Sequence, residues 1–190
     1  MKVALAQMNF LVGDVEGNTE NILSALSQVE GKADLLVVSE MAVCGYPPRD
    51  LLEVPSFLEK VEQANERIAR ETSNFKTAIL FGTVAREGEH LYNAAIVAER
   101  GKETSRHYKT LLPTYDVFDE HRYFQCAKSW SIARVAGKKI AVFICEDIWF
   151  EGLKIRYELD PAEILGAKDP DLFVAINSSP FYSNKTRTRM

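Results

Sequence analysis

Apolar runs separated by turn residues divide the sequence into short strands and longer helices. A short run that is apolar throughout is typical of a strand buried on both faces. Together with the turn residues between them, the runs predict strands at residues 2–10, 34–39, 77–86, 91–99, 103–108, 130–135, 139–144 and 171–176. Glycine-containing turns between several neighbouring strands predict that these strands pair as hairpins.

Helical spacing of apolar residues predicts three helices, at residues 18–31, 55–71 and 151–167. Asn18 or Thr19 is expected to cap the first helix, because both side chains can accept a hydrogen bond from a free backbone N–H. Pro161 is expected to break, kink or restart the third helix. Strands that alternate with helices in places and form hairpins in others predict an α+β or α/β protein with helices outside a mixed sheet.

Composition and charge narrow the class of protein. The chain has 190 residues, of which 46% are hydrophobic and 26% are charged, so we expect a single domain spanning residues 1–190. The net charge of −4 argues against a nucleic-acid partner, and no apolar run has the length of a membrane span. Three cysteines without paired spacing indicate a reducing compartment, and no signal-peptide pattern precedes the first strand. We therefore expect a cytoplasmic protein without a membrane partner.

Cys145 lies at the end of a predicted buried strand, in the segment I-A-V-F-I-C-E-D-I-W-F. The rigid strand would hold its Cα in place. The acidic turn that follows would direct backbone N–H groups at a reacting carbonyl. The alternative is that Cys145 is a small buried apolar residue, since free cysteine is among the most buried residue types.

Two further ionisable residues follow predicted strands, Glu40 after L-L-V-V-S and Lys109 after S-R-H-Y. Ligands of open sheets gather beyond the carboxyl ends of strands, so these residues and Cys145 are expected to converge. Glu40 would accept the thiol proton and later activate a water, while Lys109 would stabilise the thiolate and an oxyanion. Taken singly, Glu40 could be a loop or capping residue, and Lys109 an exposed turn lysine.

The histidines do not suggest another chemistry. His90 is in a predicted turn, His107 in a strand and His121 in a long loop, which gives poor support to a Cys-His protease. No two cysteines or histidines have the spacing of metal ligands, so no metal site is expected.

Glu40, Lys109 and Cys145, each after an apolar strand and in this order, resemble the Glu-Lys-Cys triad of the nitrilase (carbon–nitrogen hydrolase) superfamily. Three longer motifs are S-E-M-A-V-C-G-Y-P-P-R-D-L-L, Y-K-T-L-L-P-T-Y-D-V-F-D-E-H-R-Y-F and C-E-D-I-W, beginning at residues 39, 108 and 145. They are similar to the glutaminase domains of glutamine-dependent NAD synthetases, and the similarity covers nearly the whole chain.

The resemblance implies an αββα sandwich that hydrolyses the side-chain amide of L-glutamine through a Cys145 thioester. The ammonia would pass to a synthetase domain that uses ATP to amidate deamido-NAD. Glu120 matches a second glutamate that helps to hold the lysine and the base. The positions expected near the glutamine pocket are Tyr46, Tyr115, Trp149 and, in the loop that contacts substrate, Ser179. For the two tyrosines and the tryptophan, ordinary packing is the alternative.

One departure from the family pattern concerns the C-terminal end. The family's sandwich continues past the position of Ser179, so the sandwich is expected to be incomplete in these 190 residues. No phosphate-binding loop occurs in the sequence, so ATP and Mg²⁺ are expected to bind in the absent synthetase domain and no cofactor in this chain. An uncovered sheet edge favours pairing with another copy, and the resemblance places a homo-oligomer contact around residues 151–167.

Two other functions fit the sequence. The first is a stand-alone amidase of the same superfamily that acts on another small ω-amide. The second is an inactive, truncated sandwich that acts only in association with a partner.

Overall fold

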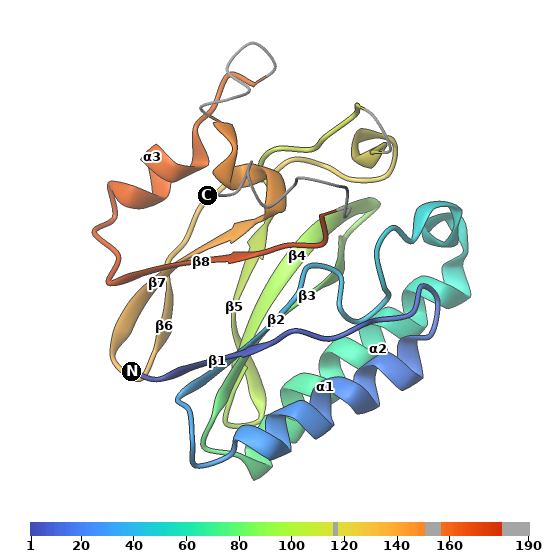
Figure 1. Cartoon of the computed structure of the whole chain (residues 1–190). Coiled ribbons are helices and arrows are strands. Elements are labelled where there is room, and N and C mark those ends of the chain that lie inside the picture. Colours follow the sequence, from blue (N-terminus) through green and yellow to red (C-terminus); the bar gives the residue numbers. More distant parts are fainter. Residues whose placement is uncertain (116–117, 151–156, 180–190) are drawn as a thin grey trace, which may run out of the picture.

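The computed structural model describes residues 1–115, 118–150 and 157–179. Two β-sheets pack face to face, and helices cover the outer face of each sheet (Figure 1). The prediction of an α+β fold with an αββα sandwich is therefore confirmed.

The larger sheet has five strands in the order β1-β2-β3-β4-β5. The first three strands are parallel, whereas β3, β4 and β5 form antiparallel hairpins. The strands are β1 (Val3–Ala6), β2 (Leu35–Val38), β3 (Ala78–Glu87), β4 (His90–Glu99) and β5 (Lys102–Tyr108). The first strand is shorter than predicted, because residues 8–10 leave the sheet and line a cavity beside Glu40.

The smaller sheet has three strands, β6 (Ala133–Val135), β7 (Lys138–Ile144) and β8 (Leu172–Ile176). The predicted hairpin of β6 and β7 is present, and β8 runs parallel to β7. The inner faces of both sheets form one apolar layer, in which Leu35 and Leu80 belong to the same cluster as Ile140 and Val142. This layer holds the ends of β2, β5 and β7 in fixed relation.

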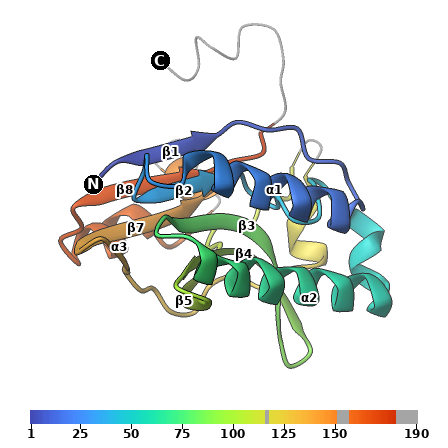
Figure 2. The same ribbon diagram turned by 90° about the horizontal axis from the view of Figure 1, so that it is seen from below.

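Helices α1 (Val15–Val29) and α2 (Pro55–Glu71) lie side by side on the outer face of the larger sheet (Figure 2). The predicted cap of α1 is wrong: the side chain of Asp14 accepts the N–H of Gly17 at 3.0 Å. Asn18 instead lies inside the helix and is buried, where its side chain bonds to the backbone of Leu11 and Val43. Its amide is needed to tie α1 to these loops.

Helix α3 (Pro161–Gly166) covers the outer face of the smaller sheet, where Leu165 packs with Ala141 and Phe143. Asp160 caps α3 and Pro161 is its first residue, so the proline begins a helix here. The N-terminal part of the predicted 151–167 helix lies outside the described residues, and residues 157–160 are not helical. Short 3₁₀ helices are η1 (Arg49–Glu53), η2 (Thr72–Asn74), η3 (Glu120–Arg122) and η4 (Cys145–Ile148).

Strand β1 lies at one edge of the larger sheet and β8 at one edge of the smaller sheet in the described part of the chain. Leu5 of β1 is 78% exposed although it pairs with Val37, which faces the inter-sheet layer. Phe173 of β8 is 56% exposed. No helix among the described residues is both long and apolar enough to cross a membrane.

Candidate active site

The three residues predicted to converge lie together beyond the ends of β2, β5 and β7. The Nζ of Lys109 is 2.9 Å from Oε1 of Glu40, although 69 positions separate them in the sequence. The charges of both groups act on the Cys145 thiol. The inter-sheet packing explains this convergence, because it brings the carboxyl ends of strands from two different sheets to one place.

Glu40 is buried, and hydrogen bonds fix its carboxylate. Oε1 accepts from Lys109 Nζ and, at 2.8 Å, from Asn93 Nδ2. Oε2 accepts the backbone N–H of Ser178 at 2.9 Å. Each carboxylate oxygen has two acceptor sites, so Oε1 is filled and Oε2 retains one. The oxygen of Glu40 that can still receive a proton is therefore Oε2.

Gly82 of β3 holds the backbone of Glu40 in place by close contact. A Cβ at this position would lie 2.4 Å from the carbonyl oxygen of Ser39 and 2.5 Å from the Cα of Glu40. The N–H of Gly82 donates to the same carbonyl at 3.1 Å. Because only glycine lacks a Cβ, this position lets the turn after β2 pack directly on β3.

Lys109 is enclosed by two carboxylates. Its Nζ also donates to Oε1 of Glu120 at 2.7 Å, and the side chain is only 1% exposed. Burial by itself lowers the pKa of Lys109, but the charges of Glu40 and Glu120 outweigh it and hold the pKa well above its usual value. Burial raises the pKa of Glu120, whose Oε1 also accepts the hydroxyl of Tyr46 at 2.9 Å.

Cys145 begins η4 with a left-handed backbone, at φ +48°. Burial, reinforced by the charge of Glu40, raises the pKa of its thiol to about 12, although the charge of Lys109 opposes this. The thiol is therefore protonated at neutral pH, and attack requires a base. The Oγ of Ser179, a predicted substrate-loop residue, is 3.7 Å from the Sγ of Cys145.

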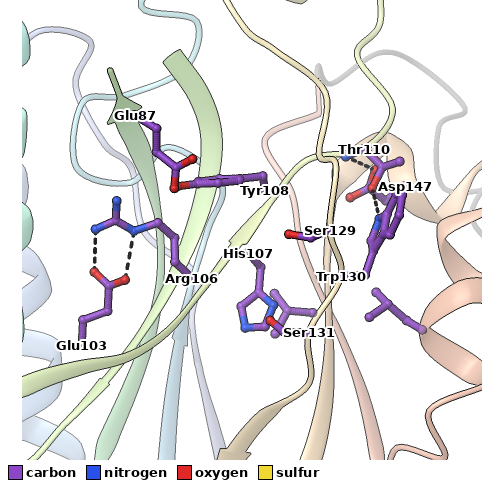
Figure 3. Close-up of a pocket in the computed structure, with 12 residues that line it drawn as sticks. Glu87, Glu103, Arg106, His107, Tyr108, Thr110, Ser129, Trp130, Ser131 and Asp147 are labelled. Carbon is purple, nitrogen blue, oxygen red and sulfur yellow. Dashed lines mark hydrogen bonds and ion pairs between the residues drawn. The ribbon is translucent and has the colours of Figure 1, made fainter. Parts of the chain in front are cut away.

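Asp147 connects the segment of the lysine to the segment of the nucleophile. Its Oδ1 accepts the backbone N–H groups of Thr110 at 2.9 Å and Leu111 at 2.8 Å, while Oδ2 accepts that of Ile144 at 3.1 Å. Burial raises the pKa of Asp147 to about 7. Figure 3 shows this carboxylate beside Thr110 and Trp130, whose indole N–H donates to the Thr110 hydroxyl at 3.0 Å.

The other predicted pocket residues lie around the triad at different depths. The hydroxyl of Tyr115 donates to Oε1 of Glu146 at 2.6 Å, and that of Tyr157 reaches the same atom at 3.3 Å. The hydroxyl of Tyr46 donates to Oε1 of Glu120, the same atom that accepts from Lys109. Trp149 is half-buried at the end of η4, and its side chain forms no hydrogen bond with the triad among the described residues.

A cavity of about 450 Å³ opens beside Glu40. Its lining includes Glu40, Tyr46 and Ser179, which gives a small substrate access to the base and to the loop beside the thiol. The remaining lining residues are Met8, Asn9, Phe10, Ser39, Met41, Pro47, Arg49 and Ser178.

A second cavity, of about 300 Å³, is lined by Asp147 and His107 among other residues (Figure 3). Burial lowers the pKa of His107 to about 4, and its Nε2 lies 3.0 Å from the hydroxyl of Ser105. His90 and His121 are exposed, and none of the three histidines bonds to Cys145 in the described structure. No cluster of three or more His, Cys, Asp or Glu among the described residues has the arrangement of a metal site.

Sequence reasoning missed three residues that shape the site: Asn93, Asp147 and Ser178. Asn93 stands within the apolar run of β4, and a polar residue inside a buried strand was the available signal. Asp147 lies in the C-E-D-I-W motif without an assigned role. Ser178 carries no sequence signal of its own, since only the fold brings its N–H to Glu40.

The chain belongs to the carbon–nitrogen hydrolase family, whose sequence profile matches residues 2–187. It is 38% identical to a glutamine-dependent NAD(+) synthetase of Aquifex aeolicus over 97% of its length, which is 31% of that protein. It is 40% identical to one of Synechocystis over 96% of its length, which is 35% of that protein. The chain thus spans about a third of the length of the curated relatives it matches.

Solved structures share the fold of this chain. The glutamine-dependent NAD+ synthetase of Acinetobacter baumannii superposes with a TM-score of 0.86 at 31% identity, over 99% of this chain and 34% of the other. An amidase of the nitrilase superfamily from Nesterenkonia superposes with a TM-score of 0.81 at 20% identity, over 99% of this chain and 68% of the other. At this identity the amidase shows the shared fold alone.

Proposed function

We propose that this chain is the glutamine-hydrolysing part of a glutamine-dependent NAD synthetase. The observation that carries the proposal is the buried contact of Lys109 with Glu40 and Glu120. It lies where the ends of β2 and β5 meet the end of β7, which Cys145 follows. The relatives named above support the choice of glutamine over other amides.

The reaction follows from the geometry of the site. Cys145 Sγ attacks the side-chain amide carbon of glutamine, and its proton passes to Oε2 of Glu40. The negative charge that develops on the amide oxygen is stabilised by Lys109, since a fixed cation acts most strongly where water is excluded. Collapse of this intermediate breaks the C–N bond, and the proton held by Glu40 leaves with the nitrogen as ammonia.

A thioester between Cys145 and the glutamyl group then remains. Glu40 removes a proton from water, which attacks the thioester carbon, and the returning proton restores the thiol as glutamate leaves. Glu120 holds Lys109 in place throughout. Because the pKa of the Cys145 thiol is about 12, each half of the cycle depends on Glu40 as a base.

Glu146 supports the recognition of an amino-acid substrate. Its carboxylate is 4% exposed and accepts two tyrosine hydroxyls, from Tyr115 and Tyr157. No lysine, arginine or histidine among the described residues forms an ion pair with it. A buried carboxylate that no described side chain neutralises suits an ammonium group, and we assign Glu146 to the α-ammonium of glutamine.

We further propose that ATP and Mg²⁺ act in a separate synthetase domain, which receives the ammonia for amidation of deamido-NAD. The chain carries no phosphate-binding loop sequence of its own. A homo-oligomer in the cytoplasm is the assembly we propose. The sheet edges at β1 and β8 support association with further polypeptide.

Ammonia release from L-glutamine by the purified protein tests the proposal. We expect release that Cys145→Ala abolishes without unfolding the chain. Glutaramic acid, which is glutamine without its α-ammonium, should be hydrolysed at least ten times more slowly, since it cannot pair with Glu146. Equal rates for the two amides would favour the stand-alone amidase, and ammonia release by Cys145→Ala would refute the mechanism.

A further inference from the structure

Asn93 bonds to both carboxylates that surround the Lys109 ammonium group and to the backbone of Lys109. It lies within β4 and is completely buried. Its Nδ2 donates to Glu40 Oε1 at 2.8 Å and to Glu120 Oε2 at 3.3 Å. Its backbone carbonyl accepts the N–H of Lys109 at 2.9 Å.

The orientation of the Asn93 amide follows from its partners. A reversed amide would place a carbonyl oxygen against two carboxylates, so the NH₂ group must face them. The oxygen Oδ1 then points away, and no donor in the described part of the chain reaches it. A buried acceptor without a partner is destabilising, so core stability does not explain an asparagine here.

Two buried carboxylates share a single lysine, so one negative charge is left without a cation of its own. The Asn93 amide compensates for this by donating to both carboxylates. Glu40 and Glu120 share the cation of Lys109, and burial raises the pKa of Glu120. Carboxylates this close favour uptake of a proton, which would remove the base. An NH₂ group that donates to both carboxylates favours their charged forms and adds no charge of its own.

We infer that Asn93 is a positioning residue for thiol activation: its NH₂ group occupies Oε1 of Glu40, so that Oε2 is the oxygen that accepts the thiol proton. The inference rests on the proposed nucleophile and base, Cys145 and Glu40, and is independent of which amide the protein hydrolyses. It requires no cofactor.

The test is the pH dependence of Cys145 alkylation by iodoacetamide, followed by mass spectrometry of the modified peptides. This readout needs no substrate. In the unaltered protein the rate should fall on the acid side as Glu40 gains a proton, and Glu40→Gln should abolish that fall. Cys44, which is fully buried, serves as an internal reporter, because it is alkylated only when the chain unfolds.

Asn93→Leu keeps the approximate shape and removes both donors. We expect the acid limb of Cys145 alkylation to move up by about one to two pH units, because hydrogen bonds to a charged group stabilise the ionised form by that order. Asn65→Leu is the matched control, since Asn65 is a buried asparagine of α2 that bonds to Thr83 and Val84 away from the triad. It should leave the limb in place.

Asn93→Asp covers the case in which Asn93→Leu fails to fold. Its carboxylate adds a further negative charge beside Glu40 and Glu120, which favours uptake of a proton, so the acid limb of Cys145 alkylation should again move up. If neither variant displaces the acid limb and Cys44 stays protected, the inference about Asn93 is overturned, while the proposed function is not. If Glu40→Gln leaves the acid limb of the otherwise unaltered protein unchanged, the proposal of Glu40 as the base is overturned.

Discussion

Asp147 accepts the backbone N–H of Thr110 at 2.9 Å and thereby joins the residue after the lysine to the turn of the nucleophile. Oδ2 of the same carboxylate accepts the N–H of Ile144, immediately before Cys145. One buried side chain therefore links the segment that follows Lys109 to the segment that precedes Cys145.

Asp147→Asn should loosen this connection. An asparagine has one acceptor oxygen, so its NH₂ group must face a backbone N–H on one side or the other. We expect a loss of about 1–3 kcal/mol in the free energy of unfolding and at least tenfold slower Cys145 alkylation. Denaturation in urea and mass spectrometry measure the two effects. Asp171→Asn, at an exposed aspartate that also accepts a backbone N–H from Lys139, should change stability far less.

Lys109→Met should destabilise the fold, because it leaves Glu40 and Glu120 buried without their cation. Removing one partner of a buried ion pair typically costs about 3–5 kcal/mol. The double variant Lys109→Met with Glu120→Gln should recover part of this stability, since it removes one of the two unpaired charges, but should recover no glutaminase activity. Additive losses in a double-mutant cycle would contradict the coupling of these two residues.

Gly82→Ala should displace Glu40, because the new Cβ would lie 2.4 Å from the carbonyl oxygen of Ser39. We expect a loss of about 1–3 kcal/mol in stability, the usual range for overpacking, together with a large fall in glutamine hydrolysis. Gly166→Ala in α3 is the control, since a Cβ there meets no atom within 4 Å. Equal effects of the two substitutions would show that the contact with Glu40 has no special role.

His107 should make the fold sensitive to acid. Burial lowers its pKa from 6.5 to about 4, so the folded state favours the neutral ring. The stabilisation is complete above pH 6.5 and is lost as pH falls towards 4, by roughly 3 kcal/mol for a shift of this size. Asp147, with a pKa raised to about 7, acts in the opposite direction, losing its contribution as pH rises through 7.

Urea denaturation of His107→Gln between pH 4 and 7 isolates the histidine. Stability should fall less on acidification than in the parent protein. His90→Gln, at an exposed position, should follow the parent curve. A parallel loss of stability in His107→Gln and the parent would show that other groups cause the acid sensitivity.

Sequence patterns predicted the elements well where local physics decides them. Helix α2 begins and ends at the predicted residues, because its apolar stripe and Pro55 at the first turn are local signals. The cap of α1 was misassigned, because Asp14 and Asn18 are equally good capping residues in isolation. The structure distinguishes them because the side chain of Asn18 bonds to the backbone of Leu11 and Val43, which lie in loops outside the helix.

The candidate site divides in the same way. Glu40, Lys109 and Cys145 were recognisable because each directly follows a predicted strand and the three occur in the order of the superfamily's triad. Asn93 and Ser178 were not recognisable, since their hydrogen bonds to Glu40 span 53 and 138 positions of the sequence.

The sequence by itself predicted most of the strands, helix α2, the family and the three residues that we propose as the triad, because these depend on periodicity and on local motifs. Only the tertiary structure decided how the triad is held. Packing of the two sheets brings separate strand ends together. Because the ends are buried, each polar group there needs a hydrogen-bond partner within the protein. That packing leaves one acceptor site on Oε2 of Glu40 and encloses Lys109 between carboxylates. It also lets Asp147 bond to the backbone beside Lys109 and beside Cys145.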